Sequence, residues 1–147
     1  MDKIEVYSNS DCLLKDNGTN HPEKKERLEI VIQSVKSLDI KIIESSLVDL
    51  NHVYKIHPKK YIENLFSLIP EIGLKGVEKE PYADTFLCPN SKNAILGSCG
   101  AGILAADSMV QNNKKAFCAV RPPGHHAEKQ KAMGFCVYNN VAVGAYY

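Results

Sequence analysis

The chain has 147 residues, with 18 Lys and Arg against 17 Asp and Glu, which gives a formal net charge of +1 at pH 7. This balance gives no electrostatic reason to expect nucleic-acid binding, and the sequence predicts neither a signal peptide nor a membrane span. With 44% hydrophobic and 24% charged residues, the composition indicates a single folded domain over residues 1–147. The five cysteines are odd in number and far apart, which favours a reducing, cytoplasmic location.

The first half of the chain predicts short strands alternating with helices. A strand is expected at 4–7 and a turn-rich loop at 8–20. A helix should then open at 20–23 (NHPE), with Asn20 or His21 as its cap and Pro22 in its first turn. A strand at 40–43 and helices at 47–55 and 59–69 follow, the two helices being separated by His57-Pro58.

The second half begins with a long loop at 70–90, because this stretch carries three prolines and two glycines. A helix at 91–110 has small and apolar residues on all sides, which is typical of a buried helix. Its glycine-rich segment 97–102 lacks the spacing of a phosphate-binding loop and predicts close packing instead. The apolar run 116–120 predicts a strand covered on both faces, and another helix follows at 139–147. This alternation indicates an α/β fold with a parallel sheet.

The most informative segment is 121–128 (RPPGHHAE), directly after the last predicted strand. Proline fixes φ and glycine permits unusual backbone angles, so the segment predicts a stiff loop that aims His125 and His126. Taken alone, two neighbouring histidines in a loop would be surface residues, and adjacent side chains are expected to diverge. However, ligands of parallel α/β sheets bind at the carboxyl ends of strands, and histidine exchanges protons near neutral pH. The pair therefore predicts acid–base chemistry.

Segments 121–128 and 133–142 (MGFCVYNNVA) together resemble the signature of the histone deacetylase superfamily, in its class II-like, bacterial and acetylpolyamine amidohydrolase-like branch. Segment 21–28 (HPEKKERL) resembles the H-P-E-x-x-E-R-L start of that family. Asp84-Thr85 resembles the pair that precedes its small-residue helix. The resemblance extends from about residue 4 to residue 147. It implies the N-terminal part of an arginase–deacetylase-type parallel sheet flanked by helices.

The resemblance implies a zinc-dependent deacetylase that hydrolyses acetyl-lysine or a related acetylated small amine. His125 and His126 match the tandem histidines that act as general base and general acid, and which of them does which stays open. Gly134 and Phe135 match tunnel-wall positions, and Arg27 matches a channel behind the site. Asp84 matches the substrate rim. From the residues alone, other readings stay open: Phe135 as a core residue, Arg27 as a solvated helix residue and Asp84 as a turn former.

The resemblance also implies zinc ligands, an aspartate and a histidine in a D-x-H motif and a second aspartate, and a transition-state tyrosine. All of these would follow the tandem histidines along the chain, and none is in this sequence. We therefore expect an incomplete fold and a chain that is inactive alone, whose partner is either a missing C-terminal half or a second copy. Two alternatives stay open: a non-catalytic remnant or binding module of the deacetylase fold, and an unrelated hydrolase with Cys136 as its nucleophile.

Overall fold

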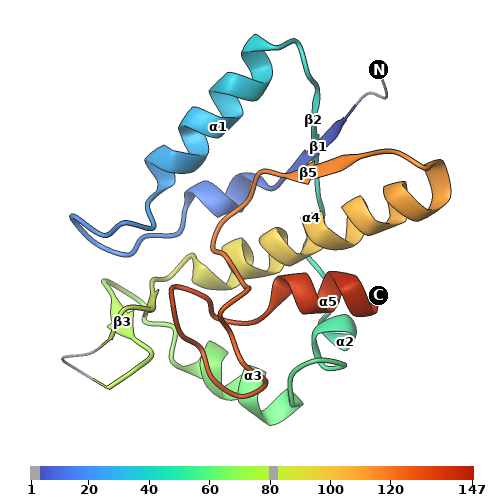
Figure 1. The fold of residues 1–147 in the computed structure, drawn as a ribbon. Coiled ribbons are helices and arrows are strands. Elements are labelled where there is room, and N and C mark those ends of the chain that lie inside the picture. The colour runs from blue at the N-terminus through green and yellow to red at the C-terminus, as the bar shows by residue number, and fades with distance from the viewer. Residues whose placement is uncertain (1–3, 80–82) are drawn as a thin grey trace.

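A small parallel sheet forms the centre of the protein in a computed structural model that describes residues 4–79 and 83–147 (Figure 1). The strand order is β2-β1-β5, with β1 at Glu5–Ser8, β2 at Ile42–Glu44 and β5 at Ala116–Cys118. Val6 of β1 lies opposite Ile42 on one side and Phe117 on the other. Parallel neighbours require a crossover between them, and the helices supply it. The predicted α/β class with a parallel sheet is confirmed.

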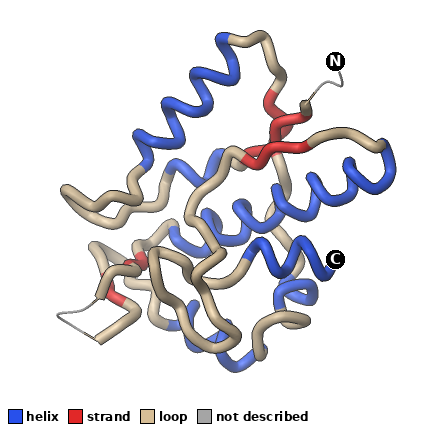
Figure 2. The backbone as a smooth tube through the Cα atoms, in the orientation of Figure 1, coloured by secondary structure: helices blue, strands red, loops and turns tan. Residues whose placement is uncertain are grey.

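Helices cover both faces of this sheet, as Figure 1 shows for α1 and α4. Val6 packs with Leu28 of α1 (Lys25–Ser37), whereas Tyr7 packs with Ala101 and Ala105 of α4 (Ser91–Asn112). This alternation follows from the two-residue period of a strand. The other described elements are the short helices η1 (Ser10–Leu13), α2 (Leu50–Val53), α3 (Lys59–Ser67) and α5 (Asn140–Tyr146), and the antiparallel pair β3 (Lys75–Gly76) and β4 (Phe86–Leu87) (Figure 2).

The largest core lies on the α4 side of the sheet, between α2, α3, α4 and α5. Its fully buried members include Val53, Ile62, Cys99, Tyr138 and Val143. By length and composition α4 is apolar enough to cross a bilayer, which the sequence pattern did not predict. However, 56% of its apolar window is buried inside the protein, where it packs against β1, β5 and α5. Among the described residues, α4 therefore has the surroundings of a core helix.

Two glycines let α4 approach neighbouring segments closely. A Cβ added at Gly100 would lie 1.9 Å from the backbone oxygen of Ser46, and one added at Gly97 would lie 2.4 Å from Cγ of Asn9. Any larger residue at Gly100 would push the 44–48 segment away from the helix, and one at Gly97 would displace the Asn9 side chain. The packing role predicted for segment 97–102 is confirmed.

The ends of several elements differ from the sequence prediction. Helix α1 begins at Lys25 with Lys24 as an N-cap that makes no side-chain hydrogen bond, so the predicted caps were wrong. Asn20 instead has φ of 66°, in a turn that precedes the helix. The predicted loop at 8–20 contains η1, and residues 80–82 of the predicted loop at 70–90 lie outside the described residues. Strand β5 is an edge strand with Phe117 48% exposed, so it is not covered on both faces.

Candidate active site at the carboxyl end of β5

The loop after β5 carries His125 and His126 to the surface, where both side chains are exposed. Their rings do not diverge as expected, because the ring centroids lie 4.3 Å apart with the planes inclined by 43°. The loop is seated on the neighbouring helices. Ser98 of α4 donates to the carbonyl of Pro122 at 3.0 Å, and a Cβ added at Gly124 would lie 2.0 Å from Oδ1 of Asn140. The loop is therefore held from below, while its two imidazoles face outward.

A cavity of about 570 Å³ opens beside these histidines, between α1, β5 and the loop. It brings together five of the residues selected from the sequence, namely Arg27, His125, His126, Gly134 and Phe135. Its other walls are largely apolar and include Leu28 and Val31 of α1, Phe117 of β5 and Val120 just after that strand. Arg27 is exposed, with its Nη1 3.4 Å from the carbonyl of Pro22. A largely apolar wall beside two adjacent imidazoles suits a ligand that has an aliphatic stem and a polar reacting end.

Gly134 and Phe135 form the tip of a two-residue turn. Met133 and Cys136 exchange backbone hydrogen bonds of 3.0 Å in both directions, and the two residues between them have φ of 58° and 68°. This is the geometry of a type I′ hairpin, in which both central residues are left-handed. A glycine suits its first position, whereas a phenylalanine at its second is unusual and costs roughly 1 kcal/mol of strain.

Asp84 does not line the cavity, and its carboxylate is instead hydrogen-bonded to the backbone of this turn. Its Oδ1 accepts from the N–H of Gly134 at 3.2 Å and from the hydroxyl of Thr85 at 2.9 Å. Partial burial would raise the pKa of Asp84, but the hydrogen bonds that it accepts, led by that from Thr85, outweigh burial and hold this pKa below its usual value. The carboxylate is therefore maintained in its ionised form, with the turn as its partner.

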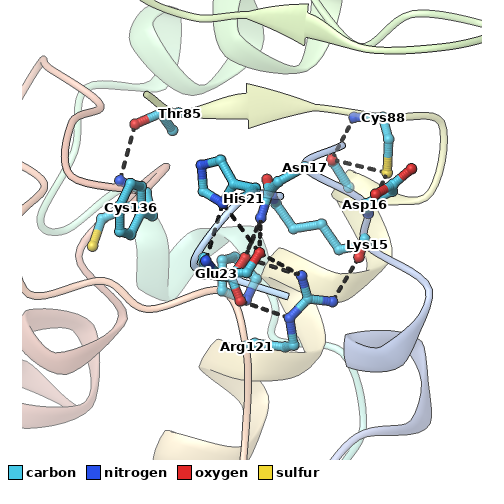
Figure 3. Close-up of polar contacts among 12 residues, drawn as sticks. Lys15, Asp16, Asn17, His21, Glu23, Thr85, Cys88, Arg121 and Cys136 are labelled. Atoms are coloured by element: carbon cyan, nitrogen blue, oxygen red, sulfur yellow. Dashed lines mark hydrogen bonds and ion pairs between the residues drawn. The ribbon is translucent and has the colours of Figure 1, made fainter. Parts of the chain in front are cut away.

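A buried ion cluster borders the same cavity through Glu23 and Arg121, and Arg121 at the head of the motif is the only part of it that the sequence analysis singled out (Figure 3). Arg121 is 4% exposed and donates through Nε and Nη2 to the Glu23 carboxylate at 2.6 and 3.0 Å. Its Nη1 donates to the carbonyls of Cys12 and Lys15 at 2.9 and 2.6 Å. This two-point ion pair takes up both oxygens of the Glu23 carboxylate.

Lys15 is the second cation of this cluster. Its Nζ hydrogen-bonds to Oδ1 of Asn17 and lies 4.0 Å from the Glu23 carboxylate, with the side chain 1% exposed. Burial lowers the pKa of Lys15 to about 8, and the nearby Glu23 offsets this in part. A lysine surrounded by leucines and asparagines in a loop sequence would ordinarily be solvated, so its burial depends on contacts that the linear sequence does not contain.

His57 is another functional candidate that the sequence left without a role. It is 1% exposed, and Nε2 accepts from the N–H of Asn139 at 2.9 Å. Nδ1 is therefore the protonated nitrogen and donates to the carbonyl of Lys129 at 2.9 Å. Burial lowers the pKa of His57, so the neutral ring is favoured. His57, just before α3, is therefore bonded to both ends of segment 129–139, which contains Gly134 and Phe135.

Cys136 does not have the environment of a nucleophile. Its side chain is fully buried, and Sγ lies 3.3 Å from the carbonyl of Gly134. Burial raises the pKa of the Cys136 thiol, which disfavours the reactive thiolate. The observed environment argues against the hydrolase that would use this cysteine.

Zinc, which the sequence resemblance implies, needs three or four nitrogen, sulfur or carboxylate ligands in one place. In residues 4–79 and 83–147, no group of three or more His, Cys, Asp or Glu side chains could hold a metal ion. The adjacent imidazoles have no third donor of this kind beside them within those residues. The side chains described do not fit a zinc site, and no metal ligand is assigned among them.

Comparison with known proteins gives a consistent family. The sequence model of the histone deacetylase domain matches residues 21–147. Histone deacetylase 5 of Arabidopsis thaliana is 32% identical over 143 residues, and the chloroplastic histone deacetylase 10 of Oryza sativa is 30% identical over 148. A probable deacetylase of Methanothermobacter thermautotrophicus is 27% identical over 129 residues. These matches cover 88%, 89% and 86% of the chain, but 21%, 33% and 37% of the respective relatives.

Solved structures agree on the fold. The crystal structure of the HDA15 HD domain superposes with a TM-score of 0.87 at 24% identity. The match covers 99% of this chain and 42% of the solved one. The arrangement of β1, β2, β5 and their helices is therefore that of a part of this larger domain.

Proposed function

This chain belongs to the histone deacetylase family, and from this premise we propose that it carries the proton-transfer part of a deacetylase active site. The proposed reaction is hydrolysis of acetyl-lysine or a related acetylated small amine. The amide C–N bond breaks, a C–O bond forms with water, and acetate and a free amine leave. The observation that supports this assignment is the pair of exposed imidazoles, 4.3 Å apart, at the rim of a largely apolar cavity.

The two histidines would divide the proton transfers between them. One takes a proton from the attacking water, and the other delivers a proton to the departing amine nitrogen, so that the proton balance closes over one turnover. Ring centroids 4.3 Å apart let both imidazoles reach one substrate atom or its neighbour. Exposure of both rings leaves their nitrogens accessible to substrate and water.

The cavity walls would bind the rest of the substrate. Phe135 and the α1–β5 wall offer apolar surface to an aliphatic stem, whereas Asp84 lies outside the cavity, bonded to the turn. The assignment of Asp84 to substrate binding therefore stays a prediction. Zinc dependence is part of the proposal at family level, where the ion would activate the water. Because the described side chains do not fit a zinc site, its ligands are not placed on this chain.

Because this chain is expected to be inactive alone, the test is deacetylation by the purified protein mixed with Zn²⁺ and the C-terminal part of a histone deacetylase domain, which would supply the metal ligands. An acetyl-lysine reporter peptide and N-acetylputrescine are the substrates, used in parallel. His125→Ala and His126→Ala should each lower the rate by about 10²-fold or more, since a general acid or base contributes that much. His52→Ala is the matched control, because His52 lies against Tyr147 and does not line the cavity. Removing metal with a chelator should abolish turnover, and Zn²⁺ should restore it.

A different set of results would favour the non-catalytic binding module. The protein would then bind the acetylated compounds without hydrolysing them, with and without Zn²⁺. Binding that is reduced by Phe135→Ala but unaffected by His126→Ala would assign the cavity to recognition alone. Turnover unaffected by both histidine substitutions would remove the acid–base assignment altogether.

A further inference from the structure

The turn at 133–136 exposes two N–H groups that its own hairpin does not use. In such a turn the flanking residues pair with each other, here Met133 with Cys136, and the central N–H groups point outward. The chain supplies acceptors for both from about fifty residues upstream. Oδ1 of Asp84 lies 3.2 Å from the nitrogen of Gly134, and Oγ1 of Thr85 lies 3.1 Å from the nitrogen of Phe135. Figure 3 shows the bond that Thr85 makes to the turn.

Thr85 is itself held in place on every side. Its side chain is fully buried, its N–H donates to Oε2 of Glu78 at 3.0 Å, and its carbonyl accepts from Val77 at 2.9 Å. Its hydroxyl proton goes to Asp84 at 2.9 Å, which leaves a lone pair for the N–H of Phe135. Both acceptors therefore stand in fixed positions, and the turn must fit them.

The opposite face of the turn touches one of the two histidines. A Cβ added at Gly134 would lie 2.9 Å from Cβ and Cγ of His126 and 3.0 Å from its Cδ2. The backbone of Gly134 is thus in direct contact with the imidazole of His126. A displacement of the turn toward or away from that ring changes the space available to it.

From these three contacts we propose that Asp84 and Thr85 are positioning residues, which hold the Gly134–Phe135 turn and thereby set the orientation of the His126 imidazole. The inference deepens the proposed deacetylase function and rests on it for the kinetic part of its test. Its structural part stands on the contacts themselves. Asp84 and Thr85 act through the turn and not on the reacting atoms.

The first experiment removes the acceptors one at a time. Thr85→Val keeps the shape of the side chain but leaves the N–H of Phe135 without a partner, and Asp84→Ala does the same to Gly134. The readout is the ¹H–¹³C NMR signals of the His126 ring, assigned with His126→Asn. Both variants should shift these signals. Thr85→Ser and Asp84→Asn, which keep an acceptor, should restore them.

Kinetics add a second readout. We expect Thr85→Val to lower kcat about tenfold or more with KM changed less than about threefold, because a misplaced catalytic group costs rate more than ground-state binding. If the unsubstituted protein shows no deacetylation with Zn²⁺ and the added C-terminal part, the proposed function fails. The NMR comparison still decides the positioning inference, so the two failures remain distinguishable.

A glycine pair provides the matched control. Gly134 and Gly73 both have positive φ, 58° and 73°, but a Cβ at Gly73 would meet nothing within 4 Å. Alanine at either position adds similar backbone strain, yet Gly134→Ala also presses on His126. Gly134→Ala should shift the His126 signals, and Gly73→Ala should leave them unchanged. His126 signals unaltered in both Thr85→Val and Gly134→Ala would overturn the inference, and Gly134→Ala decides alone if Thr85→Val does not fold.

Discussion

Arg121 and His126 lie five residues apart after the same strand, and the protein surrounds them in opposite ways. Arg121 is buried and donates to the Glu23 carboxylate and to two backbone carbonyls. His126 is exposed, and within the described part of the chain its ring nitrogens have no hydrogen-bond partner. A buried charge must be fully bonded, so Arg121 holds the backbone in one arrangement. An imidazole without fixed partners is available to exchange protons with a ligand.

One histidine links these two regions. The N–H of Glu23 donates to Nδ1 of His21 at 3.0 Å, which leaves the proton on Nε2 to be donated to the carbonyl of Asp84 at 3.0 Å. The ring of His21 also packs edge-on against Phe135, with centroids 4.8 Å apart. The ion cluster, Asp84 and the turn are therefore in continuous contact. The two regions differ in role: the buried cluster around Arg121 forms a framework that fixes the backbone, whereas His126 is an exposed side chain held on that framework.

The largest effect should come from breaking the framework at Arg121. Arg121→Ala leaves Glu23 buried without its two-point partner, which should lower the free energy of unfolding by about 3–5 kcal/mol. Chemical denaturation measures this loss. The matched control is Lys25→Ala, which removes an exposed ion pair to Glu29 and should cost less than about 1 kcal/mol. Equal losses of unfolding free energy in the two variants would show that the buried cluster stabilises the protein no more than an exposed ion pair does.

A smaller and pH-dependent effect should come from Lys15. Its pKa falls from 10.5 to about 8 on folding, so between these values the folded state binds fewer protons than the unfolded state. The free energy of unfolding therefore rises with pH across this window, by about 3 kcal/mol at ~1.4 kcal/mol per pKa unit. In Lys15→Met this rise should disappear. Denaturation of both proteins from pH 7 to 10.5 measures the difference.

The difference between the two proteins is the informative quantity, because other groups titrate in the same window. Burial raises the pKa of Cys12 to about 11 and that of Cys99 to about 12, and both effects lower stability as pH rises above about 9. These contributions are common to both proteins and cancel in the comparison. Parallel pH profiles for the two proteins would mean that Lys15 does not titrate as a buried group.

Much of the architecture could be predicted from the sequence, because it depends on local patterns. The apolar run before the motif predicted the strand β5, and the small residues of 91–110 predicted a buried α4, since both patterns are formed by neighbouring positions. The edge position of β5 could not be predicted, because strand order is a property of the whole sheet. The predicted start of α1 was wrong for a related reason, because Glu23 is bound by Arg121, which lies 98 residues away along the chain.

The candidate site divides in the same way. Motif similarity selected His125, His126, Gly134 and Phe135, and the structure brings them to one cavity together with Arg27. Motif similarity could not reveal that Gly134 contacts His126 or that Asp84 accepts a hydrogen bond from the turn, because these contacts join segments up to fifty residues apart. The buried roles of Lys15 and His57 were missed because polar residues give no burial signal in sequence. Their partners are backbone groups and distant side chains.

The smallest effect on stability should come from the histidines that the proposal makes most important. His125 and His126 are exposed, so His125→Ala and His126→Ala should each change the free energy of unfolding by less than about 0.5 kcal/mol. His57→Ala is the matched comparison: the same substitution removes two buried hydrogen bonds at 2.9 Å and should cost about 2–4 kcal/mol. Denaturation of the three variants under the same conditions compares these losses and distinguishes a buried structural histidine from the two exposed ones. If His126→Ala lowers the free energy of unfolding as much as His57→Ala does, the contact between His126 and Gly134 stabilises the turn. In that case the histidine also helps to position the turn.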